Sequence, residues 1–226
     1  MIKSFIEREN EIFNILESFN KAGLKYVLVG GYAVSAHMHR FSVDADICID
    51  KTDLAAFRNL LGSKSFVLEK RKDLEDFYKG EFESYAKRTK LPVTVDLMVG
   101  SIVSRQTNAS ISFAQLYKHS HIKSIVGIEK STSARIPIKE LLIALKIHSG
   151  RMTDARDIVA LCQGINFELV ARFIQIGNTI ETQKSINILL TYFKSENFKD
   201  SFKGVFSIEK LPANNIKTAI NLLESL

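Results

Sequence analysis

Apolar and polar residues alternate with a period of two in two segments of the chain, residues 43–49 and 93–99. In the first segment Val43, Ala45, Ile47 and Ile49 share one side, and Asp44, Asp46 and Cys48 share the other. In the second, Val93, Val95, Leu97 and Val99 alternate with Thr94, Asp96 and Met98. Successive side chains of a strand point to opposite faces, so both segments are predicted to be strands with one buried face.

Before the first alternating segment, the pattern predicts a helix, a strand and a second helix. Ser4 and Glu7 have capping-box spacing ahead of apolar residues at helical intervals, and Gly23 marks the expected end of that helix. A short buried strand is expected over residues 26–29 and a short helix over 32–39, with Gly30-Gly31 between them.

Between the two alternating segments the pattern is less regular. Thr52 is expected to cap a helix that ends at Gly62, and residues 65–69 are expected to form a strand. Residues 70–90 are rich in charge and are predicted to form a surface hairpin or loop. Their aromatic side chains are Phe77, Tyr78, Phe82 and Tyr85, interleaved with lysine and arginine, so they either stack on RNA or pack on the sheet.

From about residue 138 the chain takes a helical pattern. Helices are expected over residues 138–148, 153–163, 166–177, 179–195 and 206–225, with Thr153 and Asn166 as caps and Ser149-Gly150 as a stop. The fold class is therefore α+β, with a mixed α/β domain over residues 1–137 and a helical domain over residues 138–226. Pro137 marks the boundary.

Composition narrows the class of protein. The 226 residues are 46% hydrophobic and 25% charged, which indicates a globular chain rather than a disordered or fibrous one. A membrane span and a secretory signal are not expected, and the separated Cys48 and Cys162 favour a cytoplasmic protein. The net charge of +6 favours a polyanionic partner, although a solvated lysine-rich surface gives the same charge.

The segment from Val29 to Ile49 carries the candidate chemistry. Gly30 and Gly31 allow close approach of the backbone, and the following helix start suits phosphate. Asp44 and Asp46 point to the same side of a strand, roughly 7 Å apart, where they can share Mg²⁺. If the second alternating strand is a neighbour, Asp96 joins them as a metal ligand or general base.

Taken alone, Asp-x-Asp and Gly-Gly are common on strand faces and in turns, and only their combination is specific. In that combination the sequence resembles the DNA polymerase β-like nucleotidyltransferase superfamily, whose signature matches Gly30, Gly31, Asp44 and Asp46. Asp96 fits its third carboxylate. The resemblance implies a nucleotidyltransferase domain, a mixed sheet with flanking helices, followed here by the helical domain.

Two further segments resemble the AbiEii-like branch of that superfamily, many of whose members are toxins of toxin–antitoxin pairs. His37 to Asp46 matches one motif, with Arg40 on its arginine and Ser42 in place of the usual threonine. The helix containing Lys146 and the Asp154-x-x-Asp157 segment match another. The resemblance implies that Lys146 neutralises phosphate charge, where the pattern alone would give a solvated helix lysine. It also implies that Gly30, Gly31, Arg40, Ser42 and Asp157 contribute to nucleotide binding, with Arg40 either contacting phosphate or pairing with a carboxylate.

The implied activity is Mg²⁺-dependent transfer of an NMP from an NTP such as ATP to a hydroxyl, with release of pyrophosphate. The resemblance favours tRNA 3′ ends as the acceptor, and proteins or small molecules stay open, as does a cognate antitoxin. The alternative is a non-catalytic nucleotidyltransferase-like module that acts as an antitoxin or RNA-binding subunit. A zinc site at His37 and His39 is disfavoured because the carboxylates are hard ligands and no cysteine pair lies nearby.

Overall fold

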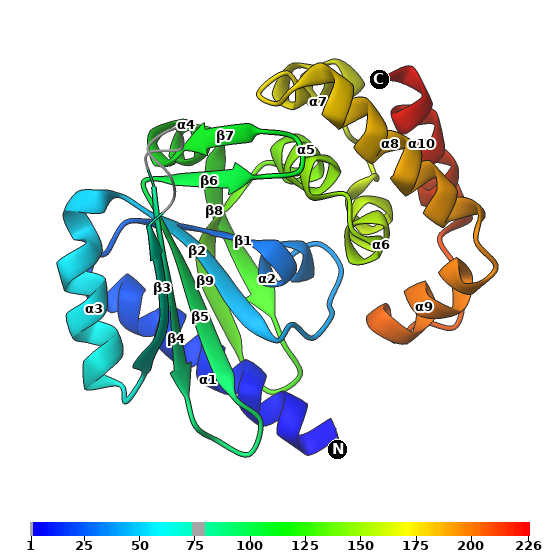
Figure 1. The fold of residues 1–226 in the computed structure, drawn as a ribbon. Helices are drawn as coiled ribbons and strands as arrows, with labels where there is room; N and C mark the ends of the chain where they lie inside the picture. The colour runs from blue at the N-terminus through cyan, green and yellow to red at the C-terminus, as the bar shows by residue number, and fades with distance from the viewer. Residues whose placement is uncertain (1, 74–79) are drawn as a thin grey trace. The chain divides into compact units, whose positions relative to one another are not determined.

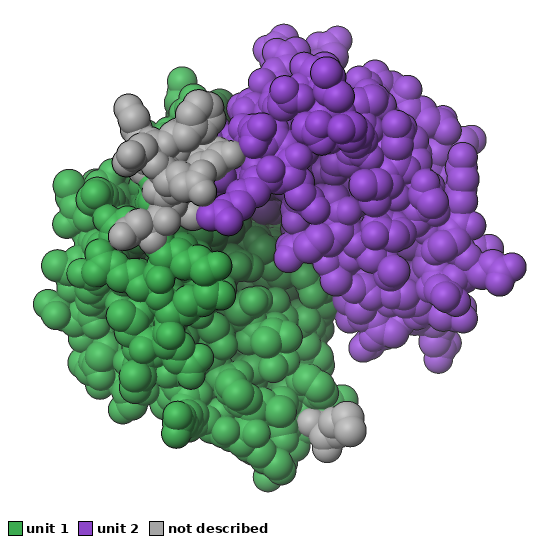
Figure 2. Space-filling view, in the orientation of Figure 1, with its two compact units in different colours: residues 1–102, 111–137 green, residues 103–110, 138–226 purple. Residues whose placement is uncertain are grey.

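The computed structural model describes residues 2–73 and 80–226. Contacts within the chain group it into two compact units, coloured separately in Figure 2. Unit 1 comprises Met1–Ile102 and Ile111–Pro137, and unit 2 comprises Val103–Ser110 and Ile138–Leu226. The short segment Val103–Ser110 therefore departs from the simple division at residue 137. Among the described residues, every helix is too short or too polar to cross a membrane.

Unit 1 is built on a five-stranded mixed sheet in the order β1-β2-β5-β4-β3 (Figure 1). The strands are β1 (Tyr26–Val29), β2 (Asp44–Ile49), β3 (Val67–Asp73), β4 (Glu81–Lys87) and β5 (Val93–Val99). Strands β2 and β5 run parallel, and the other neighbouring pairs run antiparallel. The prediction of a mixed α+β fold is thereby confirmed.

One face of this sheet forms the core of unit 1. The alternating apolar residues of β5, from Val93 to Val99, are all buried, as predicted. Helices α1 (Ile2–Lys21) and α3 (Leu54–Ser63) cover this face, and their Phe19 and Phe57 rings lie 4.9 Å apart between centroids (Figure 1). Burial of these aromatic and aliphatic side chains leaves the opposite face of the central strands for polar groups.

Several local predictions in unit 1 are wrong. Ser4 lies inside α1 rather than at its cap. Val43 is 59% exposed and precedes β2, so the strand begins at Asp44. Thr52 lies in the 3₁₀ helix η1 (Lys51–Asp53), where the Asp50 side chain accepts a hydrogen bond from its backbone N–H. A carboxylate two residues before an N–H competes well with a threonine hydroxyl for that role.

Helix α2 (Gly30–Ser35) begins two residues earlier and ends four residues earlier than predicted. The segment 70–90, expected as a surface hairpin or loop, does contain the β3–β4 hairpin, but β4 lies inside the sheet between β3 and β5, and its Glu83 and Tyr85 are buried. Phe77 and Tyr78 lie outside the described residues. The sequence pattern assigned no elements to residues 100–137. They form β6 (Ser101–Ser104), β7 (Ala109–Ser112), α4 (Phe113–Lys118), β8 (Ser120–Val126) and β9 (Ser131–Pro137).

Unit 2 is helical, apart from the tip of the β6–β7 hairpin. Its helices are α5 (Lys139–Ser149), α6 (Met152–Leu161), α7 (Phe167–Ile174), α8 (Thr179–Lys194), α9 (Asn197–Phe206) and α10 (Ala213–Ser225). Asn166 caps α7 as predicted. Thr153 does not cap α6, because the helix begins directly after Arg151. The single helix predicted over residues 206–225 is wrong: α9 ends at Phe206, and α10 begins at Ala213.

Candidate active site

Three carboxylates gather on the polar face of the sheet in unit 1. Parallel pairing of β2 with β5 sets Asp46 directly opposite Asp96, and Asp44 lies two residues before Asp46 on the same face. One oxygen from each of these three half-buried side chains lies within 4.8 Å of the others. The neighbouring strands that the sequence analysis required are therefore present, and the three aspartates are brought together.

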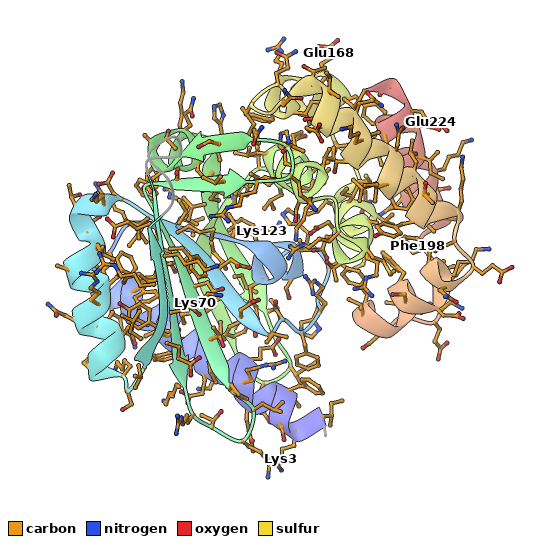
Figure 3. All side chains as sticks on the ribbon, in the orientation of Figure 1. Lys3, Lys70, Lys123, Glu168, Phe198 and Glu224 are labelled. Atoms are coloured by element: carbon orange, nitrogen blue, oxygen red, sulfur yellow. The ribbon has the colours of Figure 1, made fainter. Side chains whose placement is uncertain are left out.

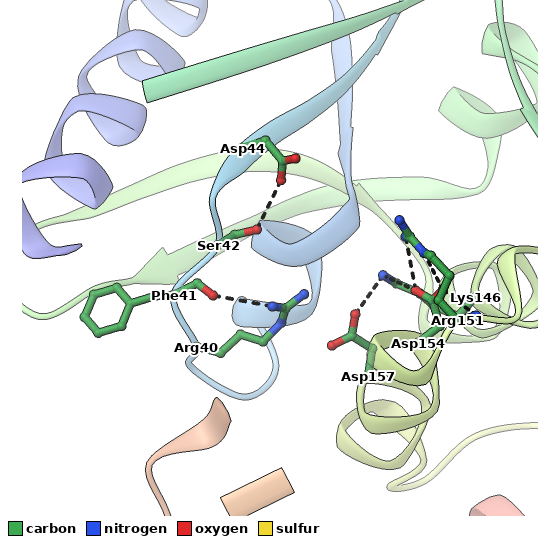
Figure 4. Close-up of polar contacts among 8 residues, drawn as sticks. All are labelled: Arg40, Phe41, Ser42, Asp44, Lys146, Arg151, Asp154 and Asp157. Carbon is green, nitrogen blue, oxygen red and sulfur yellow. Dashed lines mark hydrogen bonds and ion pairs between the residues drawn. The ribbon is translucent and has the colours of Figure 1, made fainter. Parts of the chain in front are cut away.

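Hydroxyl groups hold two of the three carboxylates. Ser84 Oγ donates a 2.6 Å hydrogen bond to Asp96 Oδ1, and Ser42 Oγ donates one of 3.4 Å to Asp44 Oδ1 (Figure 4 shows the latter). Burial raises the pKa of Asp96; the Ser84 hydrogen bond opposes this shift and the negative charge of Asp44 adds to it. Asp96 is thus a stronger proton acceptor than an exposed carboxylate.

The two glycines are required by the side chains of the site. Gly30 has a φ of +62°, and a Cβ at this position would overlap the Asp46 carboxylate. A Cβ at Gly31 would overlap Ser42 Oγ and lie 2.8 Å from Arg40 Nη2. Glycine therefore lets the end of β1 approach Asp46 and lets Arg40 and Ser42 lie against the start of α2.

Arg40 and Ser42 lie in the segment between α2 and β2. The guanidinium of Arg40 donates a hydrogen bond to the carbonyl of Phe41 (3.4 Å; Figure 4). The backbone N–H of Arg40 donates to Ser35 Oγ (3.4 Å). Tyr32 donates to the carbonyl of Ser42, also at 3.4 Å. These contacts fix a cation beside Gly31, at the β1 end of the carboxylate cluster.

A second charged cluster lies within unit 2. Lys146 is 6% exposed, and its Nζ lies 3.0 Å from Asp154 Oδ1 and 2.7 Å from Asp157 Oδ2 (Figure 4). Asp154 also accepts from the Arg151 backbone N–H (3.1 Å) and Nε (2.9 Å). Burial lowers the pKa of Lys146, but the two carboxylates outweigh it and the pKa is raised. The phosphate and nucleotide roles of Lys146 and Asp157 stay predictions.

The remaining candidates have partners in the fold. His39 Nε2 lies 3.0 Å from Glu9 Oε1, whose side chain is fully buried in α1. Tyr85 is buried and donates to Glu83 (2.7 Å), so this aromatic side chain packs within the protein, whereas Phe82 is half-buried on the carboxylate face. Sequence reasoning missed Ser84, because only the pairing of β4 with β5 identifies it as a neighbour of Asp96.

The mixed sheet with its flanking helices matches the fold of solved structures. A candidate nucleotidyltransferase from H. pylori superposes with a TM-score of 0.56 at 16% identity, over 98% of this chain and 94% of that one. JHP933 from Helicobacter pylori gives 0.54 at 17% identity, over 98% and 91%.

The lincosamide antibiotic adenylyltransferase LnuA, with lincomycin bound, gives a TM-score of 0.47 at 21% identity, over 69% of this chain and 96% of that one. No family model matches the chain, and no curated protein matches it at the sequence level. The similarity to the two Helicobacter pylori structures, at 16% and 17% identity, establishes the fold alone.

Proposed function

We propose that the protein is an Mg²⁺-dependent nucleotidyltransferase that transfers an NMP from an NTP to a hydroxyl acceptor and releases pyrophosphate. The observation that carries this proposal is the cluster of Asp44, Asp46 and Asp96, whose oxygens lie within 4.8 Å of one another. Three carboxylates at this separation repel one another unless a cation balances their charge.

The donor set suits a hard divalent cation. All three side chains offer carboxylate oxygens, the ligands that Mg²⁺ prefers, and each is partly accessible from solvent. When bound, Mg²⁺ would supply charge neutralisation for the attacking oxygen and for the leaving pyrophosphate. Asp44, Asp46 and Asp96 are the residues that would hold it.

The acceptor hydroxyl attacks the α-phosphorus, a P–O bond to the acceptor forms, and the bond between the α-phosphorus and the α,β-bridging oxygen breaks. The electron pair leaves with pyrophosphate. The hydroxyl proton goes to the Asp96 carboxylate, which the Ser84 hydroxyl orients through its hydrogen bond. Gly30, Gly31, Arg40 and Ser42 would bind the triphosphate, because the two glycines let the backbone, the Ser42 hydroxyl and the Arg40 cation come together at this end of the cluster.

Lys146 and Asp157 enter the proposal as positioning residues. The resemblance to AbiEii-like proteins implies a phosphate role for Lys146, but the lysine is buried and paired with two carboxylates. The buried ion pairs hold α5 and α6 together, and this structural role accounts for the position of Lys146 and Asp157 without any contact to phosphate.

The resemblance to AbiEii-like proteins favours tRNA 3′ ends as the acceptor and a toxin of a toxin–antitoxin pair as the role. Label transfer tests the proposal directly. Purified protein with Mg²⁺ and each α-³²P-labelled NTP in turn is incubated with total tRNA or with cell lysate, beside Asp44→Asn/Asp46→Asn. Label on RNA or protein that disappears in the double variant supports transfer. Absence of both label and Mg²⁺-dependent NTP binding would favour the non-catalytic module.

A further inference from the structure

A continuous row of residues crosses the polar face of the sheet from the candidate active site to the edge strand β3. The register pairs Asp46 with Asp96, Asp96 with Ser84, and Ser84 with Lys70. Directly paired residues share a face, so all four point to the same side. Neighbouring strands are about 4.8 Å apart, so the backbone of Lys70, labelled in Figure 3, lies about 10 Å from that of Asp96.

The next row carries an aromatic ring and a second lysine. Its register pairs Cys48 with Met98, Met98 with Phe82, and Phe82 with Lys72. Phe82 and Met98 are half-buried, whereas Lys70 and Lys72 are exposed. The β4–β3 half of the face thus combines an accessible ring with two cations.

The opposite face of the same hairpin has compensated charges. Arg71 lies 3.1 Å from Glu81 and 3.5 Å from Glu83, and Arg58 forms a further ion pair with Glu83. Lys70 and Lys72 form no ion pair with any side chain described in residues 2–72 and 80–226.

In-line displacement at phosphorus constrains where the acceptor can lie relative to the β4–β3 half of the face. Under the proposed function, on which this inference rests, the triphosphate lies at the β1 end beside Gly30, Gly31 and Arg40. The attacking oxygen must approach opposite the leaving pyrophosphate. The acceptor therefore approaches Asp96 from the side of β4 and β3.

We propose that this half of the face binds the acceptor, and that the acceptor is a single-stranded nucleic acid. Lys70 and Lys72 contact phosphates near the reactive hydroxyl, and a base stacks on Phe82 with Met98 beside it. Cations interleaved with an accessible ring are the combination by which proteins bind single strands without reading their sequence. A cationic small molecule would be repelled by the same two lysines.

The test separates the charge contribution from the stacking contribution. Fluorescence anisotropy measures binding of a labelled oligoribonucleotide of about ten nucleotides, with a free 3′ hydroxyl, at several salt concentrations. Lys70→Gln should weaken binding about fivefold to tenfold. It should also reduce the magnitude of the slope of the logarithm of the association constant against the logarithm of the salt concentration by about 0.7. Phe82→Leu should weaken binding about tenfold and leave the slope unchanged.

Lys25→Gln is the matched control, because this exposed lysine precedes β1 at the end away from Gly30. Equal losses in Lys25→Gln and Lys70→Gln would overturn the proposal, and so would an increase in the KM for NTP with oligonucleotide binding unchanged in Lys70→Gln. Failure of the catalytic proposal looks different: the wild-type protein would bind the oligonucleotide through Lys70 and transfer no label.

Discussion

Two clusters of aspartates occur in this chain, and they differ in how their charge is balanced. In unit 1, Asp44, Asp46 and Asp96 are half-buried and close together, and hydroxyls are the described groups that donate to Asp44 and Asp96. In unit 2, Asp154 and Asp157 are buried and share the ammonium of Lys146. Three carboxylates meet in the first cluster, whereas the second contains its own counter-ion.

We infer from this difference that the cluster in unit 1 performs the chemistry. Like charges held together in a folded protein cost stability, so they persist where a ligand or reaction needs them. A buried lysine between two carboxylates is costly to break but requires nothing from outside. We therefore assign metal binding and catalysis to unit 1, and the maintenance of the α5–α6 arrangement to Lys146, Asp154 and Asp157.

The largest expected effect is on catalysis in unit 1. Asp46→Asn should lower the rate of label transfer by about 10³-fold or more, because a metal-binding carboxylate is lost. Its thermal stability should be unchanged or higher, because removal of one charge relieves repulsion from Asp44 and Asp96. Asp200→Asn, at an exposed aspartate of α9, is the control and should keep full activity. A similar loss in the control would contradict the assignment.

The second effect is on stability in unit 2. Lys146→Met leaves two buried carboxylates without their counter-ion and should lower the free energy of unfolding by about 3–5 kcal/mol. Lys184→Met removes an exposed ion pair with Glu181 from the same unit and should cost at most about 1 kcal/mol. Denaturant unfolding measures both. If Lys146→Met keeps its stability but loses transfer, Lys146 acts on phosphate, as the resemblance implies.

The third prediction concerns the pH dependence of unit 2. His148 is buried, its Nδ1 lies 2.9 Å from Thr107 Oγ1, and burial lowers its pKa to about 4 despite an opposing hydrogen bond with the Phe173 backbone. Between pH 6.5 and 4 the unfolded chain binds a proton that the folded chain does not. Stability therefore falls as pH decreases through this window, by about 3 kcal/mol in total.

Comparison of variants isolates this contribution. His148→Gln should flatten the loss of stability between pH 6.5 and 4, whereas His121→Gln, at an exposed position, should leave it as in the wild type. Thermal denaturation across the pH range gives the slopes. An unchanged slope in His148→Gln would show that other groups produce the acid sensitivity.

The smallest expected effect is stabilisation by metal. Mg²⁺ added to EDTA-treated protein at ten times its Kd should stabilise the folded state by about 1.4 kcal/mol, or about 3–6 °C in Tm. Asp46→Asn should abolish this shift, and Asp200→Asn should retain it. An equal shift in Asp46→Asn would mean that Mg²⁺ binds elsewhere.

Much of the fold was predictable where the pattern is local. Period-two alternation gave β5 from Val93 to Val99, and the apolar run Tyr26–Val29 gave β1. The cap predictions were wrong where a carboxylate competes with a hydroxyl for a backbone N–H, as Asp50 does with Thr52. Residues 100–137 form short elements with mixed polarity, in which periodicity is weak.

The site was predictable only in part. Its short motifs can be recognised in the sequence, but the strand pairing that brings them together cannot. The Asp-x-Asp spacing placed Asp44 and Asp46 on one face, but Asp96 joins them only through the parallel pairing of β2 with β5. Ser84 and Lys70 depend on two further strand pairings, whose register no short segment of sequence determines. The burial of Lys146 likewise depends on how α5 and α6 pack.

We expect the three carboxylates of unit 1 to bind the metal ion that accompanies the bound nucleotide. Electron paramagnetic resonance can count bound Mn²⁺ directly, in the presence of a non-hydrolysable NTP, for the wild type and for Asp46→Asn. We expect Mn²⁺ to bind the wild type with the nucleotide and to be lost from Asp46→Asn at the same concentrations. Equal Mn²⁺ binding by both proteins, or none by the wild type, would contradict the account.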